Sequence, residues 1–438
     1  MDKKIITRFA PSPTGHFHVG GIRGALYNFI FAKQNQGVYV LRSEDTDKER
    51  SKKEYENEFL EVFEWLGLKH DQFFRQSDRL EIHQKYLKKM IEDGFAYVSK
   101  ETPKEVGQRD EVIRFKNPNK KITFQDLILG EITVDTTDLG DFIIARDINE
   151  PLYHLTVVID DFEMGITHVI RGQEHTPNTP RQILIQEAIG ATRPIYAHLP
   201  LILNSERAKL SKRDPSVMPA IEYKNEGYLP EAVLNFMAFN GWNPGGENEI
   251  FTLKELIEKF DIKKVQKGGA VFNPEKLDWL NKEHIKKFAE KNPEELKNKI
   301  FEYLPKELQI DKLIPLILER ISKFGDIKNM LEAGELDFFF KQPEYAKEKL
   351  IYKNSSKEKI EENIEKAISV LKDIEEKDFN IAQIKLNLMK LADSLDNRGE
   401  LLHPVRFALS GLDKSPDPFI IAEILGKNET LSRLQKAL

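Results

Sequence analysis

The chain has 438 residues, which is too long for one ordinary hydrophobic core, so two or more domains are expected. It has no cysteine, which excludes disulfides and any thiolate zinc site. The net charge of −6 argues weakly against a nucleic-acid partner, although local basic patches matter more than the sum. No apolar stretch is long enough for a signal peptide or a membrane span, so a soluble, cytoplasmic protein without a membrane partner is expected.

The first 95 residues alternate strand and helix patterns. Residues 5–10 predict a strand, residues 11–21 (PSPTGHFHVGG) a Gly/Pro-rich turn, and residues 22–33 a helix. Residues 38–42 predict the next strand, and an amphipathic helix follows, with one apolar stripe formed by Tyr55, Phe59, Val62, Phe63 and Leu66. This order is typical of half of an open α/β sheet.

The turn at residues 11–21 is suited to an anion. Its glycines let the backbone approach a ligand, and the new helix directs unpaired N–H groups and its positive dipole end at that ligand. Imidazoles at His16 and His18 would add donors beside the phosphates of a nucleoside triphosphate. Glycines before a helix also occur for packing reasons alone, so this segment by itself leaves a structural role open.

Short alternating runs between residues 97 and 147 predict an inserted small α+β unit. Three further apolar runs, residues 156–159, 167–171 and 195–203, predict the strands that complete the sheet. The polar stretch that follows, residues 204–214, contains the basic run Lys209-Leu-Ser-Lys-Arg213 on a flexible loop that could close over polyphosphate. An isolated run of this kind is usually a solvated surface, but its pairing with the His18 turn favours a nucleotide site. From about residue 286 the chain is rich in Lys, Glu, Leu and Ile at helical spacing, which predicts a helical bundle.

The segments His18-Val-Gly-Gly21 and Lys209-Leu-Ser-Lys-Arg213 resemble the HIGH and KMSKS signatures of the class I aminoacyl-tRNA synthetases. Flanking segments narrow the resemblance to the bacterial type of glutamate–tRNA ligase. These segments are residues 8–15 (RFAPSPTG), 42–47 (RSEDTD), 160–175 (DDFEMGITHVIRGQEH) and 227–235 (GYLPEAVLN). The C-terminal third matches more loosely, chiefly at residues 402–411 (LHPVRFALSG).

The resemblance implies a Rossmann-like open parallel sheet with a small α+β insertion, followed by an all-α anticodon-binding region. The implied domains are a catalytic domain in two halves (1–95 and 156–205), an acceptor-stem-binding insertion (96–155), a stem-contact domain with the KMSKS-like loop (206–285) and a helical anticodon-binding domain (286–438). The cysteine cluster that binds structural zinc in some relatives is missing, so neither zinc nor a protein metal site is expected.

The implied reaction joins the carboxylate of L-glutamate to the α-phosphate of ATP, with Mg²⁺, and needs no covalent enzyme intermediate. The residues implied for ATP are His18, Gly20, Gly21, Glu174, Lys209, Lys212 and Arg213, and those for catalysis are His18, Gly20, Lys209, Ser211 and Lys212. The residues implied for glutamate are Arg8, Ala10, Ser12, Glu44, Tyr153 and Arg171. Arginine forks suit carboxylates, and Glu44 would receive the ammonium group. Taken singly, Arg8 could be a surface arginine and Tyr153 a core aromatic.

The implied partners are tRNA(Glu) and L-glutamate, and a monomer is expected. Three alternatives stay open. The chain could also charge tRNA(Gln) with glutamate, it could be a glutaminyl ligase, or it could be a non-catalytic RNA-binding or ATP-binding paralogue. The helical C-terminal third disfavours the glutaminyl ligase, and the intact phosphate motifs disfavour the paralogue.

Overall fold

The computed structural model describes residues 4–101, 110–211, 214 and 217–438. The predicted residues Lys212 and Arg213 lie outside these ranges. The chain divides into two compact units, Met1–His284 and Ile285–Leu438. Among the described residues, no helix combines the length and the apolar character that crossing a membrane requires.

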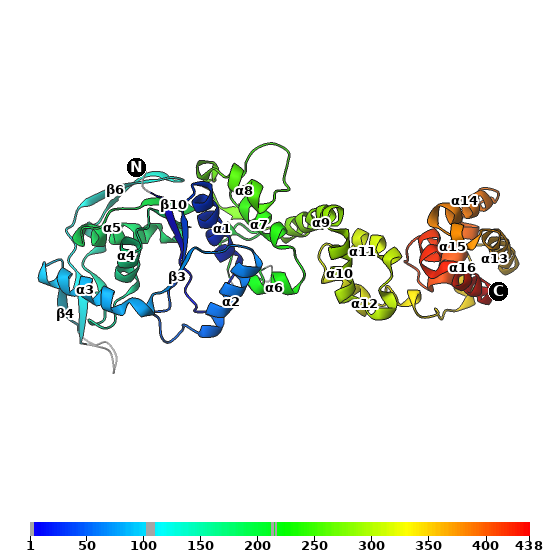
Figure 1. Ribbon diagram of the computed structural model, residues 1–438, viewed down its shortest axis with the longest axis horizontal. Helices are drawn as coiled ribbons and strands as arrows, with labels where there is room; N and C mark the ends of the chain where they lie inside the picture. Colours follow the sequence, from blue (N-terminus) through cyan, green and yellow to red (C-terminus); the bar gives the residue numbers. More distant parts are fainter. Residues whose placement is uncertain (1–3, 102–109, 212–213, 215–216) are drawn as a thin grey trace. The chain divides into compact units, whose positions relative to one another are not determined.

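The first unit is built on a seven-stranded sheet with the strand order β3-β2-β1-β9-β10-β6-β7 (Figure 1). All neighbours pair in parallel except β6 and β7, which form an antiparallel hairpin at one edge. The strands are β1 (Ile6–Phe9), β2 (Val38–Ser43), β3 (Gln72–Arg75), β6 (Lys121–Asp126), β7 (Gly130–Asp135), β9 (His168–Gly172) and β10 (Ile195–Leu199). The predicted Rossmann-like sheet is thereby confirmed.

Helices cover both faces of this sheet, because side chains along each strand alternate between two cores. In β2, Tyr39 and Leu41 belong to the core beside α1, whereas Val40 belongs to the core beside α4 and α5. Figure 1 shows α1 on one side of the sheet and α4 and α5 on the other. The helices of this unit are α1 (Val19–Gln34), α2 (Lys53–Trp65), α3 (Leu80–Glu92), α4 (Tyr153–Glu163), α5 (Thr179–Ala188), α6 (Ala220–Asn225), α7 (Pro230–Phe239) and α8 (Leu253–Lys259).

The segment between α3 and α4 contributes to two sheets. Its strands β4 (Ala96–Lys100), β5 (Glu111–Phe115) and β8 (Phe142–Ala145) form a separate antiparallel sheet. Its hairpin β6–β7 instead extends the main sheet through β10. The insertion is therefore anchored to the main sheet by one of its own hairpins. A further short pair joins β11 (Ile202–Leu203) to β12 (Ala270–Val271).

The prediction of a strand at residues 156–159 is wrong, because these residues lie inside α4. A run of four apolar residues has no period of its own, so it fits a strand buried on two faces as well as a buried helix. Here Thr156, Val157, Val158 and Ile159 are all buried within the helix, which hides the amphipathic pattern.

The second unit is helical, as predicted. Its last four helices pack on one another around buried residues such as Ile364, Leu388, Leu401 and Leu434. The helix α9 (Pro274–Lys291) spans the division between the units. The other helices are α10 (Pro293–Tyr303), α11 (Ile314–Arg320), α12 (Asp326–Glu332), α13 (Lys357–Lys372), α14 (Ile381–Ala392), α15 (Gly399–Ser410) and α16 (Pro418–Ala437).

Candidate active site

A cavity of about 550 Å³ opens beyond the C-terminal ends of β1 and β9. These neighbouring strands mark the point where the strand order reverses, which is the usual ligand site of an open α/β sheet. The residues that the resemblance implied for ATP, glutamate and catalysis all line this cavity where the structure describes them, namely Arg8, Ala10, Ser12, His18, Gly20, Gly21, Glu44, Tyr153, Arg171, Glu174, Lys209 and Ser211.

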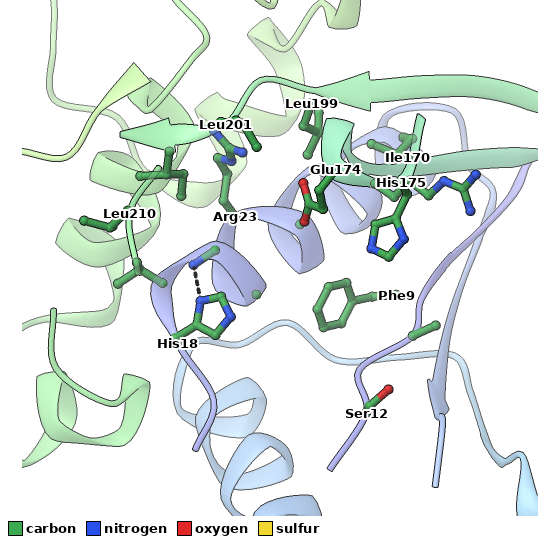
Figure 2. Close-up of a pocket in the computed structure, with 18 of the residues that line it drawn as sticks. Phe9, Ser12, His18, Arg23, Ile170, Glu174, His175, Leu199, Leu201 and Leu210 are labelled. Carbon is green, nitrogen blue, oxygen red and sulfur yellow. Dashed lines mark hydrogen bonds between the residues drawn. The ribbon is translucent and has the colours of Figure 1, made fainter. Parts of the chain in front are cut away.

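His18 is the N-cap residue of α1 and lies at the cavity wall (Figure 2). Its Nδ1 accepts the backbone N–H of Gly20 at 3.1 Å. Because Nδ1 accepts, the imidazole is neutral and carries its proton on Nε2. This tautomer makes His18 a donor toward a ligand at its Nε2 edge.

Gly20 and Gly21 are required by close packing at the same turn. A Cβ on Gly20 would lie 2.9 Å from His18 Cε1, and a Cβ on Gly21 would lie 2.2 Å from the Phe17 ring. Both amides already have acceptors, since the Gly21 N–H donates to the His18 carbonyl at 2.8 Å. These amides are therefore not the unpaired donors that the sequence predicted. A phosphate would accept from them only after their hydrogen bonds inside the turn had broken.

His16 does not take part in this site. Its ring pairs with Glu58 at 2.7 Å, its side chain is 64% exposed, and it is not among the residues that line the cavity. The prediction that His16 is a phosphate donor is wrong, because the sequence could not show Glu58 of α2 beside it.

Arg8 and Glu44 also line the cavity and are both buried. Arg8 Nε donates to both oxygens of Asp161, at 3.1 and 3.2 Å, and Glu44 accepts from Arg42 at 3.0 Å. Burial raises the pKa of Glu44 above its ordinary value, although the charge of Arg42 opposes this shift. Burial would also raise the pKa of Asp161, but Arg8 and Arg42 outweigh it and hold that pKa below the ordinary value.

Arg171 is held by a buried polar chain that begins on the inserted hairpin. Asp126, at the end of β6, accepts from His198 Nδ1 at 2.7 Å. The opposite ring nitrogen, Nε2, then accepts from Arg171 Nε at 3.3 Å, and Arg171 also donates to Thr179 at 2.8 Å. Burial lowers the pKa of Arg171 and of His198. The hairpin thus supports the orientation of a cavity arginine.

Tyr153 and His175 close the cavity beside Arg171. The Tyr153 hydroxyl lies 3.3 Å from His175 Nδ1. Burial, assisted by the charge of Arg171, lowers the pKa of His175 to about 4, so this imidazole is neutral near pH 7. Figure 2 shows His175 beside Glu174, which is on the same segment after β9.

Lys209 and Ser211 follow a tight turn after β11 and are exposed. Lys209 forms an isolated antiparallel β-bridge with Leu203, and the Leu210 N–H donates to the Ile202 carbonyl at 2.9 Å. The start of the predicted loop is therefore paired with β11 on the wall of the cavity. Two further cations of this loop, Lys212 and Arg213, lie outside the described residues.

Several residues around the cavity had no predicted role. Arg23 of α1 is buried and donates to the carbonyls of Asn240 and Pro200, and burial lowers its pKa. Arg42, Asp161 and His175 lie within the segments that carried the resemblance, but only the fold shows what they contact. Arg23, Asp126 and His198 gave no signal, since their contacts join segments that are distant in the chain.

The described residues contain no group of three or more His, Asp or Glu side chains that could hold a metal ion. Glu174 is a carboxylate on the cavity wall, close to Arg23 in Figure 2. The Glu174 carboxylate fits a Mg²⁺ ion that arrives with phosphates, because Mg²⁺ is often bound through substrate phosphates and few protein carboxylates.

Two family models together match most of the chain. Residues 4–111 and 104–279 match the catalytic domain of class I tRNA synthetases (E and Q), and residues 277–438 match an anticodon binding domain. The chain therefore belongs to the class I tRNA synthetase family for glutamate and glutamine.

Similar proteins within that family are named glutamate–tRNA ligases. One from Thermodesulfovibrio yellowstonii is 38% identical over 99% of both chains, and one from Aquifex aeolicus is 43% identical over 72% of this chain and 70% of the relative. A crystal structure of a glutamate tRNA ligase from Elizabethkingia meningosepticum, in complex with its amino acid, matches with a TM-score of 0.87, 32% identity and 99% coverage of both chains. The resemblance found in the sequence is thereby confirmed.

Proposed function

We propose that this chain attaches L-glutamate to tRNA(Glu) in two steps with ATP as the energy source. In the first step a carboxylate oxygen of glutamate bonds to the α-phosphorus of ATP, and pyrophosphate leaves. In the second step a ribose hydroxyl at the tRNA end attacks the carbonyl of glutamyl-adenylate, and AMP leaves. The observation that carries the proposal is one cavity lined both by His18, Lys209 and Ser211, named here the phosphate end, and by Arg8, Glu44 and Arg171, named here the glutamate end.

At the phosphate end, we assign to His18 the stabilisation of charge on the α-phosphate through Nε2–H. The dipole of α1 adds to this effect, whereas the amides of Gly20 and Gly21 would contribute only by exchanging their hydrogen bonds inside the turn. Lys209, Ser211 and the two cations Lys212 and Arg213 would bind the departing pyrophosphate. Mg²⁺ bound to the phosphates would neutralise part of their charge, with Glu174 as the carboxylate assigned to the ATP site.

At the glutamate end, we assign carboxylate binding to Arg8 and Arg171, whose guanidinium groups donate two hydrogen bonds each in a fork. Glu44 receives the ammonium group, and Ala10, Ser12 and Tyr153 complete the wall. Glutamine has an amide in place of one carboxylate, so its contact with an arginine loses the ionic part of a charge-assisted bond. No protein nucleophile takes part, because the substrate carboxylate itself attacks.

The helical second unit is assigned to the anticodon, which it would contact through phosphates and unpaired bases. The proposal takes a single chain as the working form, because one chain supplies every assigned cavity residue. It also places the reaction in the cytoplasm, where ATP, glutamate and tRNA are all available.

Aminoacylation of separate tRNA(Glu) and tRNA(Gln) transcripts, with labelled glutamate, ATP and Mg²⁺, tests the proposal. Charging of tRNA(Glu) alone is the expected result, and charging of both would extend the activity to tRNA(Gln). No charging of either by folded protein would overturn the proposed activity. Arg8→Lys tests the assigned site, since a single ammonium group cannot replace the guanidinium fork and the KM for glutamate should rise.

A further inference from the structure

Four charged side chains of alternating sign form a buried line beneath the glutamate end of the cavity. Arg8 of β1 contacts Asp161 of α4 at 3.1 Å, and Arg42 of β2 contacts the same Asp161 oxygen at 2.8 Å. Arg42 then contacts Glu44 at 3.0 Å. Side-chain exposure is 5% for Arg8, 9% for Asp161, 0% for Arg42 and 8% for Glu44. One line thus connects the two groups assigned to the carboxylate and the ammonium of glutamate.

Asp161 and Arg42 stand behind these two groups. Neither residue lines the cavity, whereas Arg8 and Glu44 both do. Asp161 binds Arg8 through Nε, so the two terminal amino groups of that guanidinium are left to form a fork toward a ligand carboxylate. Arg42 uses one amino group for Asp161 and the other for Glu44. The position of each cavity group is therefore fixed by the same central pair.

The line also sets the charge around the groups assigned to glutamate. With Arg171, it contains three guanidinium groups and two carboxylates, which leaves one net positive charge. L-Glutamate has two carboxylates and one ammonium group, and so it brings one net negative charge. Without the carboxylate of Asp161, Arg8 and Arg42 would lose their common partner, and the buried positive charge would no longer match the substrate.

We infer that Asp161 and Arg42 are positioning residues that align Arg8 and Glu44 for the two ends of L-glutamate. The inference rests on the proposed glutamate-binding roles of Arg8 and Glu44. Asp161 and Arg42 act through those residues without touching the substrate, so their loss should weaken glutamate binding much more than ATP binding.

The adjacent Asp160 provides a matched control. It is also buried on α4 and charged, but it accepts from Gln76 at 2.9 Å, from Arg79 at 2.7 Å and from His83 Nε2 at 2.8 Å. None of these three partners lines the cavity. A buried carboxylate that supports the fold is therefore available one residue away, and although its charge acts on Arg42, its hydrogen bonds go to these three partners outside the line.

The test measures the KM for glutamate and the KM for ATP separately, in full-length wild type, Asp161→Asn and Asp160→Asn, together with their melting temperatures. Asp161→Asn should raise the KM for glutamate by about tenfold to a hundredfold, as expected for loss of a charge-assisted bond, and change the KM for ATP by less than about threefold. Asp160→Asn should lower the melting temperature and leave both KM values close to wild type.

Arg42→Lys gives a second measurement that does not depend on the folding of Asp161→Asn. Lysine keeps the positive charge but cannot span Asp161 and Glu44 with one planar fork, so the same selective rise for glutamate is expected. An unchanged KM for glutamate in a folded Asp161→Asn or Arg42→Lys protein would overturn the inference, as would equal changes for both substrates. If Arg8→Lys also left the KM for glutamate unchanged, the proposed glutamate site itself would fail.

Discussion

At the scale of single residues, the phosphate end depends on how closely the backbone of α1 passes the His18 ring. Gly20→Ala would place a Cβ 2.9 Å from Cε1 and 3.1 Å from Nδ1 of that ring, which forces His18 to move. Pyrophosphate exchange in the presence of tRNA(Glu) should slow by about tenfold to a hundredfold, because small misplacements of a catalytic group are costly. Alanine is the better helix former, which offsets part of the cost of moving the His18 ring, so the melting temperature should change little.

Gly268→Ala is the matched control for this change. A Cβ at Gly268 would meet nothing within 4 Å, and the residue is exposed. The exchange rate of Gly268→Ala should equal that of wild type. Equal rates in Gly20→Ala and wild type would mean that the position of His18 does not limit activation.

The raised pKa of Glu44 predicts that the KM for glutamate depends on pH more strongly than the KM for ATP. Burial raises its pKa, so this carboxylate takes up a proton at a higher pH than an ordinary glutamate does. The protonated form carries no negative charge for the ammonium group. The KM for glutamate should therefore rise as the pH is lowered from about 8 toward the raised pKa, while the KM for ATP changes less. Glu44→Gln should have a high KM for glutamate across the same range, and a parallel pH profile in this variant would assign the titration to another group.

At the scale of elements, Asp160 ties α4 to α3 and to the short 3-10 turn Ser77–Arg79 through His83 and Arg79. Burial would raise the pKa of Asp160, but its hydrogen bond to His83 and the charge of Arg42 lower it to about 2. A lowered pKa means that this stabilisation is complete above the unfolded pKa of about 4 and is lost as the pH falls to about 2. The difference between a pKa of about 4 and one of about 2 corresponds to about 2 kcal/mol of folding stability.

Acid unfolding followed by circular dichroism checks this assignment. Between about pH 4 and pH 2, the stability of Asp160→Asn should fall less steeply than that of wild type, because the variant has no carboxylate to protonate at this position. An identical slope in the two proteins would show that other carboxylates account for the acid sensitivity.

The elements also show where sequence reasoning succeeds and where it stops. The amphipathic stripe of α2 is confirmed, since Phe59, Val62 and Phe63 are buried at a spacing that only a helix satisfies. Residues 156–159 were misassigned because a uniformly apolar run gives no period. The joining of β6 to β10 is a contact between distant segments, and the period within a strand carries no information about its neighbour in the sheet.

Some residues of the candidate site could also be predicted from the sequence, and others could not. The residues assigned to ATP and glutamate could be identified from the glycine-rich and charged motifs, and those described line the cavity, whereas His16 of the same motif does not. Asp126 and His198 could not, since their effect on Arg171 depends on a hydrogen-bond chain across three strands. Arg42 and Asp161 were visible in the motifs, but the sequence could not show that they contact each other. Partners of buried charges become known only with the tertiary structure.

At the scale of the whole molecule, two units with separate cores should respond separately to core mutations. Ile364 of α13 is fully buried in the second unit, and Ile364→Ala should cost about 2 to 5 kcal/mol in that unit. Its calorimetric transition should fall by about 5 to 15 °C, while the transition of the first unit stays in place. Below the lowered transition, the KM values for ATP and glutamate should not change, because all described cavity residues belong to the first unit.

Asp160→Asn is the complementary change, since it should lower the transition of the first unit and leave that of the second in place. If each variant lowers only the transition of its own unit, the first unit and the helical unit unfold independently. A single transition that shifts as a whole in both variants would instead show that the two cores unfold together. In that case a mutation in the helical unit would lower charging only by reducing the fraction of folded protein. Its effect on charging would then disappear at a lower temperature, where the variant is fully folded.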